Sequence, residues 1–125
     1  MICPCGSGRP YSGCCEPLHG GAPADTAEDL MRSRFSAFAL GLDVYLLASW
    51  HLATRPATLK LDPATVWRKL QIVDTVDGGP SADIGVVEFR ASLRNADGAA
   101  GVLHERSRFA RVGGLWTYFD GDILD

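Results

Sequence analysis

The chain has 125 residues, 46% of them hydrophobic, and its 12 basic and 15 acidic side chains give a net charge of −3. That length holds one core of ordinary size and a small appendage. A nucleic-acid binder concentrates positive charge, so this balance argues against one. No apolar run of 18 residues is present to span a membrane, and a soluble protein is expected.

All four cysteines lie in the first fifteen residues, as Cys3 and Cys5 followed by Cys14 and Cys15. Thiolates crowded on so short a loop repel one another unless a cation or a covalent bond joins them. The chain starts without the basic and apolar regions of a secretory leader, so we expect a cytoplasmic protein rather than a disulfide-bonded one. Neighbouring cysteines also bridge one another poorly. The pattern therefore predicts one tetrahedral Zn²⁺ bound by four sulfurs.

An iron–sulfur cluster and a labile disulfide are the alternatives, although this spacing is not a usual iron–sulfur run. Gly6, Gly8 and Gly13 favour a metal knuckle, because they let the backbone turn with its amides facing the thiolates. Four protein ligands leave no open position for water or substrate. The predicted zinc site is therefore structural rather than catalytic.

The sequence divides into three parts: residues 1–19 as a zinc knuckle, 20–24 as a linker and 25–125 as the main domain. The stretch 17–24 contains two prolines and two glycines and little to bury, which is typical of a linker. His19 lies in this stretch and is expected in solvent.

Helical periodicity follows the linker. Asp25 or Thr26 can cap a first helix, and Gly41 stands where a left-handed residue would end it. A second helix is predicted from Asp43 through Trp50. It is apolar on nearly all sides, so we expect it to be largely buried.

Asp62-Pro63 is a cap-plus-proline signal for a short third helix before Trp67. The period then changes from 3.6 to 2, which predicts four strands at 70–76, 84–93, 102–112 and 115–119. Short turns make neighbouring strands antiparallel. This order indicates an α+β domain of about three helices packed on one face of a curved antiparallel sheet.

The run from Cys3-Pro4-Cys5-Gly6-Ser7-Gly8 through Tyr11 to Cys14-Cys15 resembles the SEC-C zinc motif, which also occurs at the C-terminus of the preprotein translocase ATPase SecA. There the knuckle docks a chaperone partner. The translocase motif is flanked by several lysines, whereas this chain has only Arg9. The resemblance implies the zinc and its four ligands, and it does not extend to that partner.

Further residues resemble the bacterial YchJ family over nearly the whole chain: Met31-Arg32-Ser33-Arg34 with Ala37, Tyr45-Leu46, Trp50-His51, His104-Glu105-Arg106-Ser107-Arg108-Phe109, Gly114, Trp116, Tyr118 and Asp120-Gly121. This resemblance implies a SEC-C knuckle joined to a cone-shaped domain of the nuclear transport factor 2-like superfamily. Some members carry a second knuckle at the C-terminus, for which this chain has no cysteines. The family implies a fold and a zinc site, but no established reaction.

By analogy of fold, the open end of such a cone is a natural pocket. On a helical wheel Arg34 falls on the inward arc with Leu30 and Phe38. Strand alternation places Glu105 on the same face as Phe109. A guanidinium and a carboxylate buried in one cavity are expected to form a direct, bidentate pair. The other pocket candidates are Asp43, Tyr45 and Trp50.

Two classes of function stay open. In the first, the protein is a binding module whose knuckle docks a protein partner and whose cone holds a small ligand, a peptide or a second subunit of a homodimer. In the second, it is a small hydrolase- or lyase-like enzyme with Glu105 or Asp43 as general base and Tyr45, His51 or His104 as acid. The binding module is favoured, because an arginine-paired carboxylate is a weak base and His104 faces away from Glu105.

Other side chains have plainer interpretations. The three tryptophans are expected in the core, and Asp120-Gly121 is expected to form a turn after the last strand. A basic strip on the third strand is expected to be a solvated face, formed by Arg106, Arg108 and Arg111.

Overall fold

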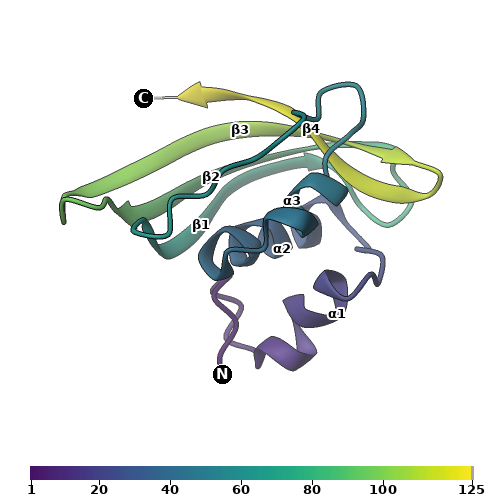
Figure 1. The fold of residues 1–125 in the computed structure, drawn as a ribbon. Coiled ribbons are helices and arrows are strands. Elements are labelled where there is room, and N and C mark those ends of the chain that lie inside the picture. The colour runs from purple at the N-terminus through teal and green to yellow at the C-terminus, as the bar shows by residue number, and fades with distance from the viewer. Residues whose placement is uncertain (125) are drawn as a thin grey trace.

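Three layers make up the computed structural model, which describes residues 1–124: a curved sheet, two helices beneath it, and the cysteine segment on the far side of those helices (Figure 1). The elements in chain order are a 3₁₀ turn Tyr11–Gly13, α1 Cys15–His19, α2 Ala27–Leu40, α3 Asp43–Ala48, β1 Val66–Asp77, β2 Ile84–Arg94, β3 Ala100–Val112 and β4 Leu115–Leu124. None of the helices within residues 1–124 is long and apolar enough to cross a membrane.

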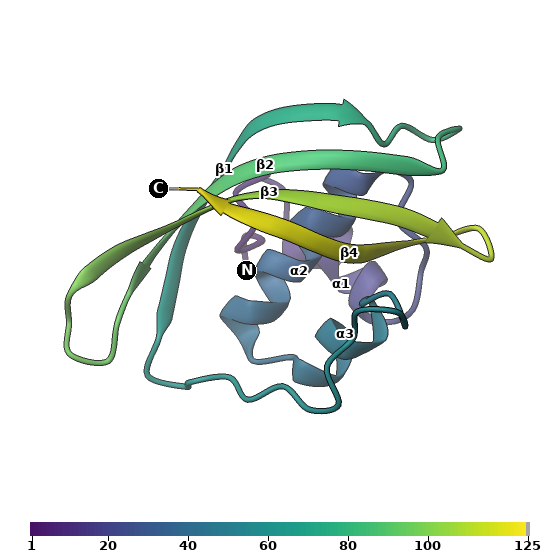
Figure 2. The same ribbon diagram turned by 90° about the horizontal axis from the view of Figure 1, so that it is seen from above.

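The sheet follows the chain, with spatial order β1-β2-β3-β4 and antiparallel pairing throughout. Its register shifts twice between β1 and β2 and once between β3 and β4. Such irregularities increase local twist, and Figure 2 shows the strands bending over the helices. The predicted fold class, an α+β domain with helices on one face of a curved antiparallel sheet, is confirmed.

The last strand is longer than predicted. Asp120 pairs with Arg108, and Gly121 pairs with Ser107, so both residues lie inside β4. The predicted Asp120-Gly121 turn is therefore wrong. An aspartate–glycine pair is typical of turns. Here β3 is long enough for β4 to stay paired with it through Leu124, so the chain does not turn at Asp120.

Helix α2 begins and ends as predicted. The Thr26 hydroxyl accepts a hydrogen bond from the Asp29 amide at 3.0 Å, and Gly41 ends the helix with φ 73°. Its inner face packs against the concave side of the sheet. The buried core there consists of Ala24, Ala27, Leu30, Met31, Phe35, Leu70, Val87, Phe89, Ala91, Phe109 and Trp116.

Two glycines let the start of α2 approach the β1–β2 turn. A Cβ on Gly78 would lie 2.9 Å from the Ala27 Cβ, and one on Gly85 would lie 2.6 Å from the Gly78 Cα. The Ala27 amide donates to the Gly78 carbonyl at 2.9 Å in the same place. The glycines therefore set how closely the helix meets the sheet.

Helix α3 starts at Asp43 but is not largely buried, so that expectation is wrong. Leu46 is fully buried, whereas Val44 is 76% exposed. Six residues make fewer than two turns, and only the side facing α2 is covered.

No helix forms at Asp62-Pro63, contrary to prediction. The Asp62 carboxylate accepts from the Ala64 amide at 2.9 Å and closes a single turn. The next residue but one, Val66, already pairs with Arg94 across the sheet. Strand β1 therefore begins to pair with β2 before a second helical turn can form. Besides α2 and α3, residues 1–124 contain one further α-helix, α1, which lies in the cysteine segment rather than before Trp67.

Candidate metal centre and binding grooves

The four predicted cysteines come together at one point. Their sulfurs all lie within 4.8 Å of one another, with Cys5 and Cys14 at 3.6 Å and Cys14 and Cys15 at 3.9 Å. Sulfurs placed about 2.3 Å from a central zinc ion would be separated by about 3.8 Å, whereas a disulfide requires about 2.05 Å. The arrangement fits a tetrahedral metal site.

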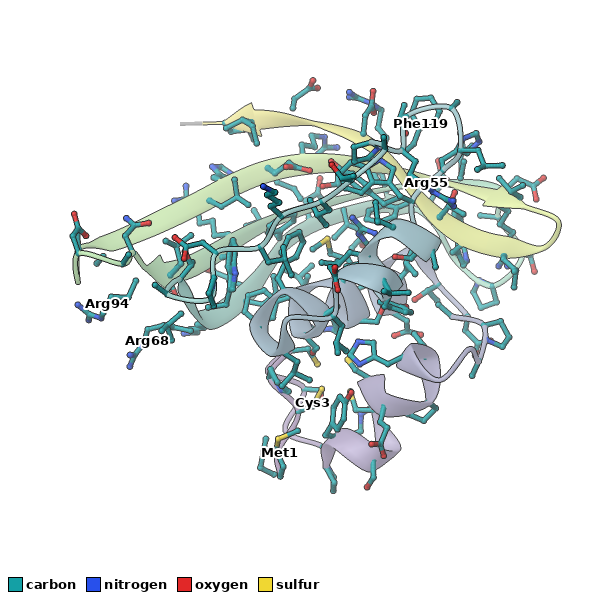
Figure 3. All side chains as sticks on the ribbon, in the orientation of Figure 1. Met1, Cys3, Arg55, Arg68, Arg94 and Phe119 are labelled. Carbon is teal, nitrogen blue, oxygen red and sulfur yellow. The ribbon has the colours of Figure 1, made fainter. Side chains whose placement is uncertain are left out.

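Short backbone contacts build this loop. The Cys3 amide donates to the Arg9 carbonyl and the Tyr11 amide to the Met1 carbonyl, both at 2.9 Å. Gly6 turns the chain between them with φ 82°, a conformation that favours glycine. The 3₁₀ turn and α1 then carry the last two cysteines back toward the first two. Figure 3 shows Met1 and Cys3 at the end of the molecule away from the sheet.

Hydroxyl groups surround the sulfurs. Ser36 of α2 is fully buried, donates to the Cys15 sulfur at 3.3 Å and lies 3.5 Å from the Cys3 sulfur. Ser7 lies 3.2 Å from the Cys14 sulfur. These contacts orient and stabilise thiolates, as outer partners of metal ligands do. The hydrogen bond from Cys15 lowers the pKa of Cys5, and the same bond raises the pKa of Cys15.

The knuckle, residues 1–19, is held against α2 by more than its cysteines. The Arg32 guanidinium donates to the Cys5 carbonyl at 2.9 Å. The His19 ring accepts from the Tyr11 hydroxyl at 2.6 Å and donates to the Ser33 carbonyl at 2.8 Å. His19 was expected in solvent, and this is wrong: the ring also packs edge-on against Tyr45 at 4.7 Å. Neither its spacing nor its neighbours in the sequence signal this role.

Arg34 points inward, as its place on the helical wheel predicts, and only 3% of it is exposed. It donates to the Leu46 carbonyl at 2.8 Å and to the Ser49 hydroxyl at 2.6 Å. Its guanidinium carbon lies over the rings of Trp50, at 5.0 Å, and Tyr118, at 4.6 Å. Burial lowers the pKa of Arg34 to about 10, which leaves it charged at neutral pH.

Glu105 lies on the same face of the sheet but does not pair with Arg34. No ion pair joins them anywhere in residues 1–124, so the predicted bidentate contact is wrong. The carboxylate accepts instead from the Ser107 hydroxyl at 2.6 Å and the Tyr118 hydroxyl at 2.9 Å. Tyr118 therefore links the two charges, with its ring beside Arg34 and its hydroxyl on Glu105.

Gly121 makes the position of Glu105 possible. A Cβ at 121 would overlap the Glu105 carboxylate. The absence of a side chain on β4 lets the carboxylate lie flat across the strand and reach Tyr118. Burial and the nearby charge of Glu105 raise the pKa of Tyr118, which keeps its hydroxyl protonated as the donor.

A groove of about 570 Å³ lies between the knuckle and α3. One wall comes from α1 and the following segment, the other from α3, with the start of β4 at one side. Its lining includes Leu18, Ala22, Leu42, Tyr45, Ala48 and Trp116. We call this the first groove. The predicted linker 20–24 thus forms a wall and also buries Ala24 in the core, which its composition did not indicate.

A second groove of about 620 Å³ lies between the end of α2 and residues 59–65. Gly41 and Asp43 line both grooves. Of the five residues predicted for the pocket, Asp43 and Tyr45 line the first groove. The other three, Arg34, Trp50 and Glu105, line neither groove and lie where α2 and the α3 end meet the sheet.

Known proteins match this chain along nearly its full length. A family model described as the YchJ middle NTF2-like domain matches residues 26–121. The UPF0225 protein of Streptomyces coelicolor is 54% identical over 124 residues, which cover 98% of this chain and 96% of the relative. A UPF0225 protein of Corynebacterium glutamicum is 46% identical over 122 residues, covering 97% of this chain and 96% of the relative.

Two solved structures share the fold. The solution structure of a SEC-C motif containing protein from Rhodopseudomonas palustris aligns over 100% of both chains with a TM-score of 0.85 and 31% identity. The crystal structure of a SEC-C motif containing protein from Psychrobacter arcticus aligns over 100% of this chain and 81% of its own, with a TM-score of 0.75 and 28% identity. The chain therefore belongs to the YchJ family, also named UPF0225.

Proposed function

We propose that the protein is a zinc-stabilised binding module that holds a segment of a protein partner in the first groove. The observation that carries this proposal is the origin of the two walls: one comes from the knuckle and the segment after it, the other from α3. The knuckle thereby contributes directly to the surface that a partner would contact.

The donor set supports zinc as the metal. Four thiolates at tetrahedral spacing suit Zn²⁺, and a site closed by four protein ligands is of the structural kind. Cys3, Cys5, Cys14 and Cys15 would hold the ion, which supplies cohesion to the loop rather than a reactive water. Reduced thiolates also suit the cytoplasm, where we propose that the protein works.

The surroundings of the two carboxylates considered as bases support binding over catalysis. One carboxylate oxygen of Glu105 accepts hydrogen bonds from both the Ser107 and the Tyr118 hydroxyls, an arrangement typical of a structural carboxylate. Asp43 is exposed at the edge of the groove, with no histidine or tyrosine bonded to it among residues 1–124. The position of Asp43 therefore suits electrostatic attraction of a partner better than proton transfer as a general base.

Site-specific photo-crosslinking tests the proposal. A benzoylphenylalanine placed at Val44, on the lip of the first groove, should give a discrete adduct in cells. The same group at Thr75, an exposed position on β1, should give none. Adding Ala48→Trp should abolish the adduct at position 44, because the indole would occupy part of the groove and block the bound segment. Equal labelling from both positions, or none from position 44, would refute the proposal.

A further inference from the structure

Asp43 occupies an unusual place, at the corner where α2 turns into α3. Its carboxylate is exposed and forms no hydrogen bond or ion pair with any residue in 1–124. As the first residue of α3 it could serve as a helix cap, but the cap residue of that helix is Leu42 and no side-chain cap bond is made. The fold therefore leaves this charge uncommitted.

The surroundings of Asp43 are apolar and open. Leu40 is 39% exposed and Val44 is 76% exposed on either side of it. Together with Leu42 they line the grooves that meet at Asp43. Exposed apolar side chains gathered around a groove mark an interaction site, whereas scattered ones do not.

Charge varies along this surface. Among residues 1–124, Asp43 is the one aspartate, glutamate, lysine or arginine that lines the first groove, and the His19 ring there is hydrogen-bonded to Tyr11 and Ser33. The second groove adds Lys60 and Asp62. A cationic side chain is thus attracted at Asp43, whereas the opposite charges of Lys60 and Asp62 offset one another in the second groove.

The size of the site indicates a chain segment. Small-molecule pockets usually measure about 300–1,000 Å³. The two grooves, of about 570 and 620 Å³, share Gly41 and Asp43 in their linings, and a ligand that occupied both would exceed that range. A net charge of −3 adds a general attraction for basic partners.

We infer that the corner formed by the ends of the two grooves binds a peptide segment in which one arginine or lysine is flanked by apolar residues, with the cation held by Asp43. This inference rests on the proposed function and adds the chemistry of the partner. Apolar side chains fill the first groove, and the guanidinium or ammonium makes a charge-assisted contact with the carboxylate.

Peptide titration followed by amide NMR tests the inference on the full chain. Three probes differ only at the centre of acetyl-Leu-Ala-X-Ala-Leu-amide, where X is arginine, its neutral isostere citrulline, or glutamate. We expect the arginine peptide to shift the resonances of Gly41, Asp43 and Tyr45, and to bind about three- to fivefold more tightly than the citrulline peptide. The glutamate peptide should bind most weakly.

Two matched variants locate the effect. Asp43→Asn should reduce the preference for arginine over citrulline below about twofold. Asp83→Asn removes the same charge at an exposed residue that lines neither groove and should leave the preference intact. The comparison of peptides on the unaltered protein gives an answer even if Asp43→Asn folds poorly.

Three results would overturn the inference: no shift at the corner with the arginine peptide, equal affinity for all three peptides, or a preference that survives Asp43→Asn. Equal affinity, or an adduct at position 44 without arginine preference, would leave the binding module standing and show that its partner is recognised by apolar contacts alone.

Discussion

At the scale of single residues, Arg34 shows how a charge is kept inside this protein without a carboxylate against it. The Leu46 carbonyl and the Ser49 hydroxyl, at the end of α3, accept hydrogen bonds from its guanidinium. The rings of Trp50 and Tyr118 lie against the guanidinium plane. Ring faces carry partial negative charge and attract a guanidinium. Glu105 acts on Arg34 only at longer range, through Tyr118.

The first prediction follows from that arrangement. Arg34→Ala should lower the free energy of unfolding by about 3–5 kcal/mol, because it empties a buried site and strands its acceptors. Glu105→Gln should cost about 1–2 kcal/mol, since it weakens two hydroxyl hydrogen bonds. Urea denaturation measures both. A double-mutant cycle should give a coupling below about 1 kcal/mol, whereas a direct buried pair would give more.

Gly121 provides the second prediction. Gly121→Ala should displace the Glu105 carboxylate, break its bond to Tyr118 and cost about 1–3 kcal/mol by overpacking. Gly79→Ala is the matched control, because a Cβ there meets nothing within 4 Å, and its effect should stay within about 0.5 kcal/mol. Thermal melts of the two variants decide the matter. Equal stability of the Gly121→Ala and Gly79→Ala variants would mean that the Glu105 carboxylate can adopt another position at no cost.

The sequence is informative about single residues only where chemistry or period fixes them. Cysteine spacing predicts the four-cysteine cluster, which could hold a metal ion, and the helical wheel predicts that Arg34 turns inward. The partner of Arg34 could not be predicted, because Tyr118 reaches it through the pairing of β4 and the register shift between Arg108 and Phe109, which leaves Phe119 without a partner in the β3–β4 pairing. The groove walls at 20–24 were missed for a similar reason: their role depends on how α1 packs on α2.

At the scale of elements, the outer face of the sheet is a ladder of opposite charges. Arg106 on β3 contacts Asp74 on β1 at 3.0 Å and Glu88 on β2 at 2.9 Å. On the β4 side, Arg108 contacts Asp122 at 2.8 Å. The predicted solvated basic face is thus paired across strands. Arg111 departs from it, since it stacks on Trp116 at 4.5 Å.

This ladder gives the third prediction, a dependence on pH. Hydrogen bonds from His104 and Arg106 hold the pKa of Glu88 below its ordinary value. The unfolded chain therefore binds a proton more readily than the folded one, and the stabilisation is lost as pH falls below about 4.3. Urea midpoints measured from pH 6 to pH 2.5 should fall less steeply for Glu88→Gln than for the unaltered chain. Glu16→Gln, an exposed change on α1, should follow the unaltered chain.

The cysteine loop gives the fourth prediction. Protein purified under reducing conditions without chelator should contain one zinc ion per chain, with Zn–S distances of about 2.3 Å in X-ray absorption spectra. A metal content near zero, or disulfides among the four cysteines by mass spectrometry, would contradict it.

Periodicity predicts most elements here, and local signals mislead where sheet pairing competes. The alternation of apolar residues located all four strands, and a threonine cap and a glycine end located α2. The signals at Asp62-Pro63 and Asp120-Gly121 were overridden because Val66 and Asp120 find partners in the neighbouring strands. Such long-range pairing is not visible in a local pattern.

At the scale of the whole molecule, the knuckle and the main domain share a polar seam along α2. Arg32, Ser33 and Ser36 all contact residues of the knuckle. The hydrophobic core, in contrast, draws almost entirely on residues from 24 onward. The knuckle is therefore attached firmly without carrying the core.

The fifth prediction concerns this attachment. The chain without residues 1–20 should still melt cooperatively, because the core remains, but at a lower temperature than the full chain, because buried hydroxyls of α2 lose their partners. Differential scanning calorimetry measures both. If the truncated chain shows no transition, the knuckle must be required for the core itself.

The strand order has a consequence for the way the chain folds. Every strand pairs with its neighbour in sequence, so the sheet can grow by closing three short hairpins at little entropic cost. The segment after α3 is different, because the Thr54 hydroxyl donates to the carbonyl of Phe119, 65 residues later in the chain. Figure 3 labels Arg55 and Phe119 near one another, above α3 and beside β4. That closure brings Trp50 to Tyr118 and so completes the surroundings of Arg34. The surroundings of Arg34 are thus complete only when residues 50–55 have docked on β4.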